Sequence, residues 1–133
     1  MPRRQRHNPC PLCRFLQPRR LPARYVVVHR FPRSVALLHP KQYYPGHCEL
    51  WLKPHARELF QLSQAVRTDF LNEMTLLAQA IHETLSPRKI NYELLGNVAP
   101  HLHWHVIPRY PDDPLPRSTV WVNPRYTSPT RKT

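Results

Sequence analysis

Short segments in which apolar and polar positions alternate are the dominant pattern along this chain. Side chains of a β-strand point alternately to opposite faces, so a period of two predicts strands with one buried face. The segments with this alternation, or with many β-branched and apolar residues, are 25–31, 34–39, 47–53, 89–95 and 101–107. Pro32 and Arg33 separate the first two, and GNVAP at 96–100 separates the last two. We therefore expect two β-hairpins.

One long segment instead has the period of an α-helix. After Ser63, apolar residues recur at spacings of three and four, which is typical of one face of an amphipathic helix. The residues of this face are Val66, Phe70, Met74, Leu77, Ile81 and Leu85. Ser63 is a suitable N-cap, and Pro87 would end the helix. A single helix provides too few crossover connections for a parallel sheet, so the pattern predicts an α+β fold with an antiparallel sheet.

The length of 133 residues is enough for one compact domain. We expect a basic arm over residues 1–9, a folded domain over 10–122 and a tail over 123–133, because the chain starts arginine-rich and is proline-rich from residue 111. STVWV at 118–122 is a possible strand within the proline-rich part. No apolar run approaches the roughly 20 residues that cross a bilayer, so we expect no membrane span and a cytoplasmic location.

The positive charge is concentrated at the start of the chain. The formal net charge is +12, and residues 1–33 contain nine arginines and no acidic residue. A basic arm of this kind attracts RNA and other phosphate polymers without reading their sequence. Two other interpretations stay open, because charged tails also keep proteins soluble and organellar transit peptides are also arginine-rich.

Cys10 and Cys13 form a C-P-L-C pair in a chain with three cysteines and no secretory signal. Cytosolic thiols are kept reduced, so the pair is not expected to belong to a disulfide scaffold. Two thiolates at this spacing can bind one tetrahedral zinc ion, which would need two further ligands, and two unrelated structural thiols are the alternative. Cys48 alternates with Leu50 and Leu52 and is expected in the core.

PHLHWHVIPR at 100–109 contains a histidine at every second position. The two alternating rows are His101, His103 and His105, and Leu102, Trp104 and Val106. If the apolar row packs on the core, the three imidazoles lie on the opposite face of the strand. Such a row can be a polar sheet face, a three-histidine metal site, or a site where one imidazole attacks phosphorus. Acids are scarce on the predicted strands of this basic chain, which favours phosphate chemistry.

The same stretch matches the His-φ-His-φ-His-φ-φ signature of the histidine-triad superfamily of nucleotide hydrolases and transferases, where φ is an apolar residue. PGHCELWLKPH at 45–55 resembles a second block of that superfamily, and CPLC and KINYELLGN resemble a bacterial branch of it. The resemblance extends from Cys10 to about Trp121. It implies a homodimeric α+β fold and a two-step attack at the α-phosphate of a nucleotide.

The resemblance also implies roles for single residues. His103 would be the nucleophile and would carry a covalent nucleotidyl intermediate. His105 would contact the phosphate near the leaving group, and His47 would lie beside the same phosphate. Asn97 occupies a position where related proteins use a glutamine close to the phosphate, and Asn91 is a looser match to a further polar contact.

Two positions depart from the superfamily pattern. Eight residues before His47, related proteins often have an Asp or Asn that holds the ribose, and this chain has His39. Three residues before the first triad histidine, the phosphoramidase branch commonly has a small hydroxyl residue, and this chain has Val98. His39 is therefore expected at a substrate-binding position, and the way in which the ribose is held stays open.

A zinc site is a further implication of the resemblance. Related bacterial proteins bind zinc through an N-terminal CxxC pair, the histidine after the Pro-Gly-His strand and the first triad histidine. These ligands correspond to Cys10, Cys13, His55 and His101. His7 is an alternative to His55. Two sulfur and two nitrogen donors suit a closed structural tetrahedron. His101 is thus both a candidate catalytic residue and a candidate zinc ligand.

From these residues we expect a hydrolase of nucleoside phosphoramidates or dinucleoside polyphosphates that releases a nucleoside monophosphate. The alternative is a zinc-containing nucleotide- or RNA-binding protein that has the same fold and little turnover. The sequence does not identify the base, the leaving group or the physiological substrate.

Overall fold

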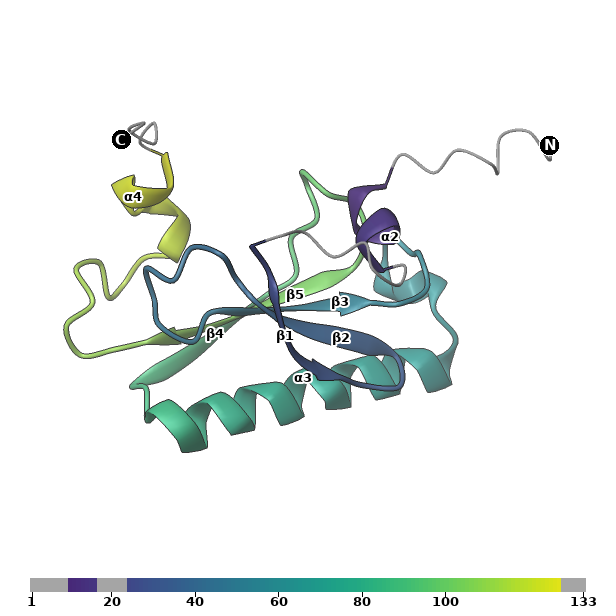
Figure 1. The fold of residues 1–133 in the computed structure, drawn as a ribbon, viewed down its shortest axis with the longest axis horizontal. Helices are drawn as coiled ribbons and strands as arrows, with labels where there is room; N and C mark the ends of the chain where they lie inside the picture. Colours follow the sequence, from purple (N-terminus) through teal and green to yellow (C-terminus); the bar gives the residue numbers. More distant parts are fainter. Residues whose placement is uncertain (1–9, 17–23, 128–133) are drawn as a thin grey trace.

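The computed structural model describes residues 10–16 and 24–127 (Figure 1). The basic arm predicted over residues 1–9 lies outside the described residues, and so does His7. The same is true of 17–23 and 128–133. In the ranges that are described, no helix is both long enough and apolar enough to cross a membrane.

Five antiparallel strands form one sheet, in the order β1-β2-β3-β5-β4. The strands are β1 (Val26–Arg30), β2 (Ser34–Leu38), β3 (Cys48–Leu52), β4 (Lys89–Glu93) and β5 (His103–Arg109). Both predicted hairpins are confirmed, because β1 pairs with β2 and β4 pairs with β5. The prediction of an α+β fold with an antiparallel sheet is also confirmed.

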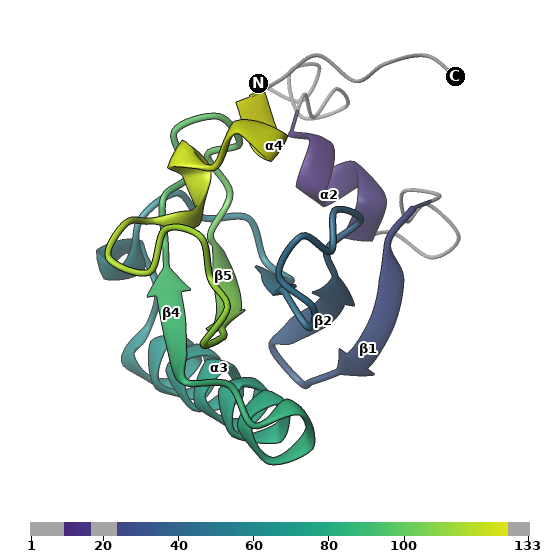
Figure 2. The same cartoon turned by 90° about the vertical axis from the view of Figure 1, so that its left-hand side faces the viewer.

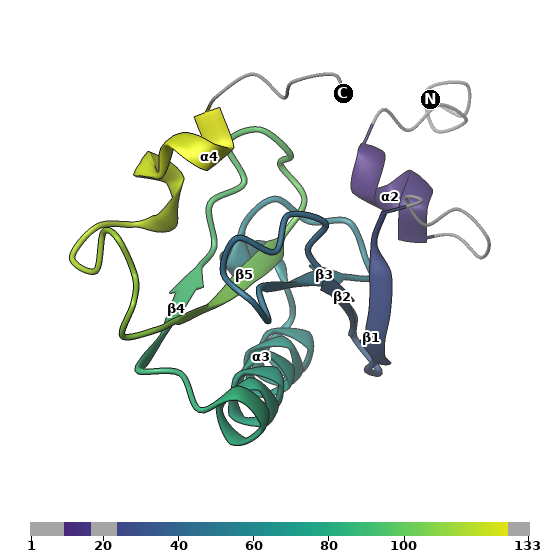
Figure 3. The same ribbon diagram turned by 60° about the vertical axis from the view of Figure 1, so that its left-hand side comes forward.

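Helix α3 (Gln64–Leu85) covers one face of this sheet (Figures 1 and 2). The helix begins as predicted, with the Ser63 hydroxyl accepting a hydrogen bond from the Val66 N–H at 3.2 Å. Its buried apolar face, with Phe70, Leu77 and Ile81, packs into the main core. The short helices α2 (Pro11–Leu16) and α4 (Pro124–Thr127) lie on the other side of the sheet (Figure 3).

Alternation along β3 and β5 divides their side chains between the two faces of the sheet. Cys48, Leu50 and Leu52 of β3 belong to the core under α3, together with Val106 of β5. The intervening residues of both strands project to the opposite face. The predicted apolar row is therefore confirmed as a core row.

The predicted start of the histidine strand is wrong by two residues. His103 and His105 lie on β5, whereas His101 precedes it. The main chain before β5 is held by loop contacts: the His101 N–H donates to the Ala99 carbonyl at 2.8 Å, and the Leu102 N–H donates to the Ala56 carbonyl at 2.8 Å. The His101 ring is held separately from the other two histidines, with Nε2 on the Leu52 carbonyl and Nδ1 beside Cys10 and Cys13.

The strand predicted at 118–122 is also wrong, because Val120–Val122 form a 3₁₀-helix, η2. The buried guanidinium of Arg109 explains the difference. Its Nη1 donates to the Ser118 carbonyl and its Nη2 to the Leu115 carbonyl, both at 2.7 Å. The Ser118 carbonyl, which a strand over 118–122 would offer to a neighbouring strand, is thus bound by a side chain. Val120 then packs beside Tyr44 and Ile107.

The turn before β3 depends on Gly46. Its φ of +95° is a conformation that L-residues rarely adopt, and a Cβ here would overlap Leu85 Cδ1 and lie 3.3 Å from Pro108 Cγ. Gly96 also has a positive φ, of +75°, but a Cβ there would meet nothing closer than 3.7 Å. Leu85 is partly exposed and can move aside, so the buried Pro108 ring is the firmer contact, and Gly46 has less room for a side chain than Gly96.

We predict that Gly46→Ala lowers the free energy of unfolding by about 2–4 kcal/mol, because backbone strain and overpacking add. Gly96→Ala is the matched control. It should lose only the stability that backbone strain costs, about 1 kcal/mol. Chemical denaturation of both variants measures the difference. Equal losses in the two variants would show that the contacts with Pro108 and Leu85 do not constrain the turn.

Candidate functional site

Four predicted metal ligands come together beside the start of β5. Cys10 immediately precedes α2, and Cys13 lies in α2. His55 comes from the segment after β3, and His101 from the segment before β5. His101 Nδ1 lies 3.4 Å from Cys10 Sγ, 3.3 Å from Cys13 Sγ and 3.1 Å from His55 Nδ1. Cys13 Sγ lies 3.2 Å from His55 Nδ1. We call this group the Cys/His cluster.

The Cys/His cluster fits a tetrahedral metal ion. Donors bound to zinc at about 2.0–2.3 Å are about 3.3–3.8 Å apart, close to the 3.1–3.4 Å observed here. His101 Nε2 contacts the Leu52 carbonyl at 2.6 Å. A carbonyl only accepts, so Nε2 carries the proton and the lone pair of Nδ1 points at the cysteines. The cluster is positioned to bind a metal, with the ligands that the sequence indicated.

A second site lies on the sheet face opposite α3. A cavity of about 400 Å³ is lined by residues of α2, β3, β5 and η2 and by the loop 95–99. His103 and His105 of β5 line it together with His39 and Asn97. We call it the histidine cavity. His101 does not line it, since its ring is part of the Cys/His cluster.

The His103 ring is fixed by the main chain of His101. His103 Nδ1 lies 2.7 Å from the His101 carbonyl oxygen. Because that oxygen can only accept, Nδ1 carries the proton, and Nε2 of the neutral ring has a free lone pair. His103 is 8% exposed and lines the histidine cavity. The contact thus selects the tautomer whose nucleophilic nitrogen is Nε2.

His47 and His105 form a hydrogen-bonded pair beside His103. His47 Nε2 lies 3.0 Å from His105 Nδ1. The pKa of His47 is lowered to about 2, mainly by burial and in smaller part by the neighbouring His39 and His105. Burial also lowers the pKa of His105 to about 4, although the charge of Glu49 opposes this. Both rings are therefore neutral at pH 7.

The direction of this hydrogen bond follows from His47 Nδ1, a buried atom for which the described residues provide no hydrogen-bond partner. A buried N–H without a partner is rarer in proteins than an acceptor without one. The proton of His47 is therefore assigned to Nε2, which donates to His105 Nδ1. His105 then presents its Nε2–H to the cavity as a hydrogen-bond donor.

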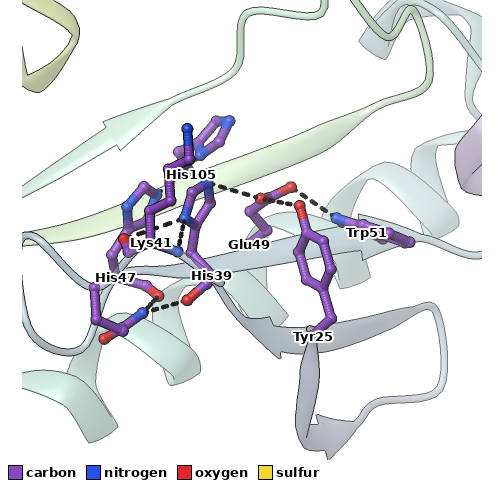
Figure 4. A network of polar contacts seen from close by, with 8 residues as sticks. Tyr25, His39, Lys41, His47, Glu49, Trp51 and His105 are labelled. Carbon is purple, nitrogen blue, oxygen red and sulfur yellow. Dashed lines mark hydrogen bonds and ion pairs between the residues drawn. The ribbon is translucent and has the colours of Figure 1, made fainter. Parts of the chain in front are cut away.

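His39 extends this group towards β3 (Figure 4). Its ring stacks on His47, with centroids 4.2 Å apart and planes within 7°. His39 Nδ1 accepts a hydrogen bond from the Lys41 N–H at 3.0 Å, and its Nε2 lies 3.5 Å from Glu49 Oε2. Burial lowers the pKa of His39, while Glu49 acts in the opposite direction. His39 thus lines the cavity, and its predicted role in substrate binding stays a prediction.

Sequence reasoning did not assign Glu49 or Trp121 to the site. Glu49 is the cross-strand partner of His105 and is held by Tyr25 and Trp51 (Figure 4). Its alternation with buried apolar residues of β3 could have placed it on the histidine face. The ring centroid of Trp121 lies 4.9 Å from that of His105. No local pattern indicates this contact, because η2 belongs to the proline-rich part of the chain.

The two candidate asparagines lie in different places. Asn97 lines the histidine cavity in the loop after Gly96. Asn91 on β4 instead accepts a hydrogen bond from Arg109 Nη1 at 2.6 Å and lines a separate depression beside Lys89. Its predicted contact with substrate stays a prediction.

Comparisons with known proteins agree with this architecture. A sequence model of the HIT domain matches residues 21–112. A histidine triad protein from Bradyrhizobium japonicum is 28% identical, with a TM-score of 0.70 and a match over 78% of each chain. A histidine triad protein from Marinobacter aquaeolei is 27% identical, with a TM-score of 0.66 over 78% of this chain and 76% of that one. A HIT family member from Bacillus subtilis is 22% identical, with a TM-score of 0.68 over 79% and 76%.

A comparison with curated protein sequences found no match. HIT proteins bind nucleotides and most are hydrolases, although some are not catalytic. The domain match covers more than half of the sequence, and the fold is that of the solved HIT structures. The chain therefore belongs to the HIT domain family.

Proposed function

We propose that the protein is a nucleotide hydrolase in which His103 attacks the α-phosphate of a nucleoside phosphoramidate or dinucleoside polyphosphate. The observation that carries the proposal is the 2.7 Å contact between His103 Nδ1 and the His101 carbonyl, which leaves Nε2 with its lone pair in the histidine cavity. A neutral imidazole held in this way needs no separate base before it attacks phosphorus.

In the first step, the lone pair of His103 Nε2 forms the N–P bond while the bond from phosphorus to the leaving group breaks. The leaving group departs with the bonding electrons and takes a proton from water. His105 Nε2–H donates a hydrogen bond to an oxygen of the reacting phosphate and stabilises the negative charge that develops there. Nδ1–H of His103 stays on the His101 carbonyl, which stabilises the positive charge that the ring acquires.

In the second step, a water oxygen attacks the same phosphorus. The N–P bond breaks, its electrons return to His103 Nε2, and a proton passes to solvent. The products are a nucleoside monophosphate and the starting tautomer of His103. Because β5 holds His103 and His105 on one rigid strand, the same geometry serves both steps.

The Cys/His cluster is proposed to hold a structural zinc ion through Cys10, Cys13, His55 and His101. Zinc in a closed site with four protein ligands supplies folding energy and no open coordination position. Its contribution here would be to hold α2 and the segment before β5 against each other. Leu12 of α2 lines the histidine cavity, so the same ion would fix part of the cavity wall.

We predict that His103→Ala lowers turnover of a nucleoside phosphoramidate by roughly four orders of magnitude, while nucleotide affinity changes only a few-fold. Single-turnover kinetics and calorimetry measure the two effects. His82→Ala, on the exposed side of α3, is the matched control and should behave as the wild type. Near-normal hydrolysis by His103→Ala would exclude the proposed nucleophile, and a wild type that binds nucleotide without releasing product would favour the binding-protein alternative.

For the metal, we predict that protein purified without chelators contains about one zinc ion per chain by elemental analysis. Cys13→Ser should lose most of the zinc and unfold at a lower temperature, because the closed site is incomplete. Cys48→Ala is the control: this cysteine lies in the core under α3, so its removal should leave the zinc content unchanged. Wild-type protein without zinc would contradict the assignment.

A further inference from the structure

The proposed attack on phosphorus makes no use of Glu49, although this carboxylate lies on the floor of the histidine cavity. Glu49 is 5% exposed, and a carboxylate oxygen and the ring nitrogens of His103 and His105 all lie within 4.8 Å of one another. A negative charge at this position repels a phosphate group. Glu49 therefore needs a role that concerns another part of the ligand.

Two hydrogen bonds fix the carboxylate in place (Figure 4). The Tyr25 hydroxyl donates to Oε2 and Trp51 Nε1–H donates to Oε1, both at 2.9 Å. Burial raises the pKa of Tyr25, and the charge of Glu49 raises it further, so the phenol stays a donor. An ionised carboxylate offers about four acceptor positions, so further donors can still be bound. Glu49 is thus a rigid acceptor facing the cavity.

The surroundings of Glu49 indicate which end of a nucleotide it faces. His103 and Gly96 line the histidine cavity and also a smaller cavity of about 140 Å³, which Arg57 and Leu59 line as well. Glu49 lines only the larger one, together with the apolar and aromatic surfaces of Leu12 and Trp51. The larger cavity suits a nucleoside, and the smaller one gives the leaving group a separate place beside His103.

Within a nucleotide, the sugar is the part nearest to Glu49. The ribose is joined to the α-phosphate through a single bridging oxygen, whereas the polar edge of the base lies beyond the sugar. With phosphorus next to His103 Nε2, the ribose hydroxyls are the ligand donors within reach of an acceptor beside His103 and His105. A carboxylate only accepts, so it is complementary to two neighbouring hydroxyls.

We propose that Glu49 is a specificity-determining residue that accepts hydrogen bonds from the ribose hydroxyls and so selects ribonucleotides over deoxyribonucleotides. This inference rests on nucleotide binding in the proposed function, but not on turnover. It assigns sugar recognition to β3, whereas the sequence pattern had pointed to position 39. His39 Nε2, 3.5 Å from Glu49 Oε2, then acts as a neighbour that helps to hold the carboxylate.

The experiment measures the affinity of the full chain for AMP and for 2′,3′-dideoxy-AMP by calorimetry. Hydrogen bonds to a charged group are worth enough to give roughly a 10- to 100-fold preference of the wild type for AMP. In Glu49→Gln the ratio of the two affinities should fall to within about threefold. The side-chain oxygen of Gln can still accept from Trp51 and its amide can donate to the Tyr25 hydroxyl, so this variant is expected to fold.

The ratio separates sugar recognition from charge, because loss of the negative charge changes phosphate binding equally for both nucleotides. Glu49→Asp provides a second variant that keeps the charge and withdraws the carboxylate from the sugar, and it should also lose the preference. Glu83→Gln, on the exposed side of α3, is the matched charge control and should keep the wild-type ratio. Thermal denaturation checks the fold of each variant.

An unchanged ratio in both Glu49 variants would overturn the proposal, and so would a wild type that binds both nucleotides equally. Loss of a second bound zinc ion in Glu49→Gln, with sugar preference intact, would identify Glu49 as a metal ligand and also overturn it. A wild type that prefers AMP but does not hydrolyse nucleotides would contradict the proposed hydrolase while supporting the role of Glu49.

Discussion

The site depends on the way in which His101 is held, because this one residue belongs to the Cys/His cluster and also contacts His103 of the histidine cavity. Its ring Nδ1 faces the Cys/His cluster, its Nε2 is bonded to the Leu52 carbonyl, and its own carbonyl accepts from His103. A displacement of the His101 main chain would break the hydrogen bond to His103 Nδ1, so the ring would no longer be restricted to one tautomer. The cluster and the proposed nucleophile are therefore parts of one arrangement, although they line different spaces.

Burial and the direction of hydrogen bonds, more than positive charge, give the histidine cavity its chemistry. The pKa values of His47 and His105 are lowered mainly by burial, so their pair acts as an aligned set of neutral donors. Glu49 adds a negative charge in the same cavity, held by Tyr25 and Trp51. A nucleotide would thus meet donors at the phosphate and an acceptor at the sugar.

Local periodicity was sufficient to predict most of the fold and the placing of His103 and His105 on one face of a strand. The sequence did not indicate that β5 begins at His103, because the position of His101 depends on Cys10 and Cys13, about ninety residues earlier in the chain. It did not indicate η2 either, because the segment before η2 is held by the Arg109 side chain, which binds the Leu115 and Ser118 carbonyls. The alternation along β3 indicates the face on which Glu49 lies, but its pairing with His105 depends on sheet register, and Trp121 reaches the cavity through loop packing that has no local signature.

The most direct test of the fixed nucleophile is ¹⁵N NMR of the imidazole nitrogens in the metal-loaded protein near neutral pH. The His103 ring should have its proton on Nδ1, with an unprotonated Nε2, because the His101 carbonyl accepts from Nδ1. Chelation of the metal should convert this single tautomer into a mixture. A His103 ring with its proton on Nε2 in the metal-loaded protein would contradict the proposed role of His101 and the attack by Nε2.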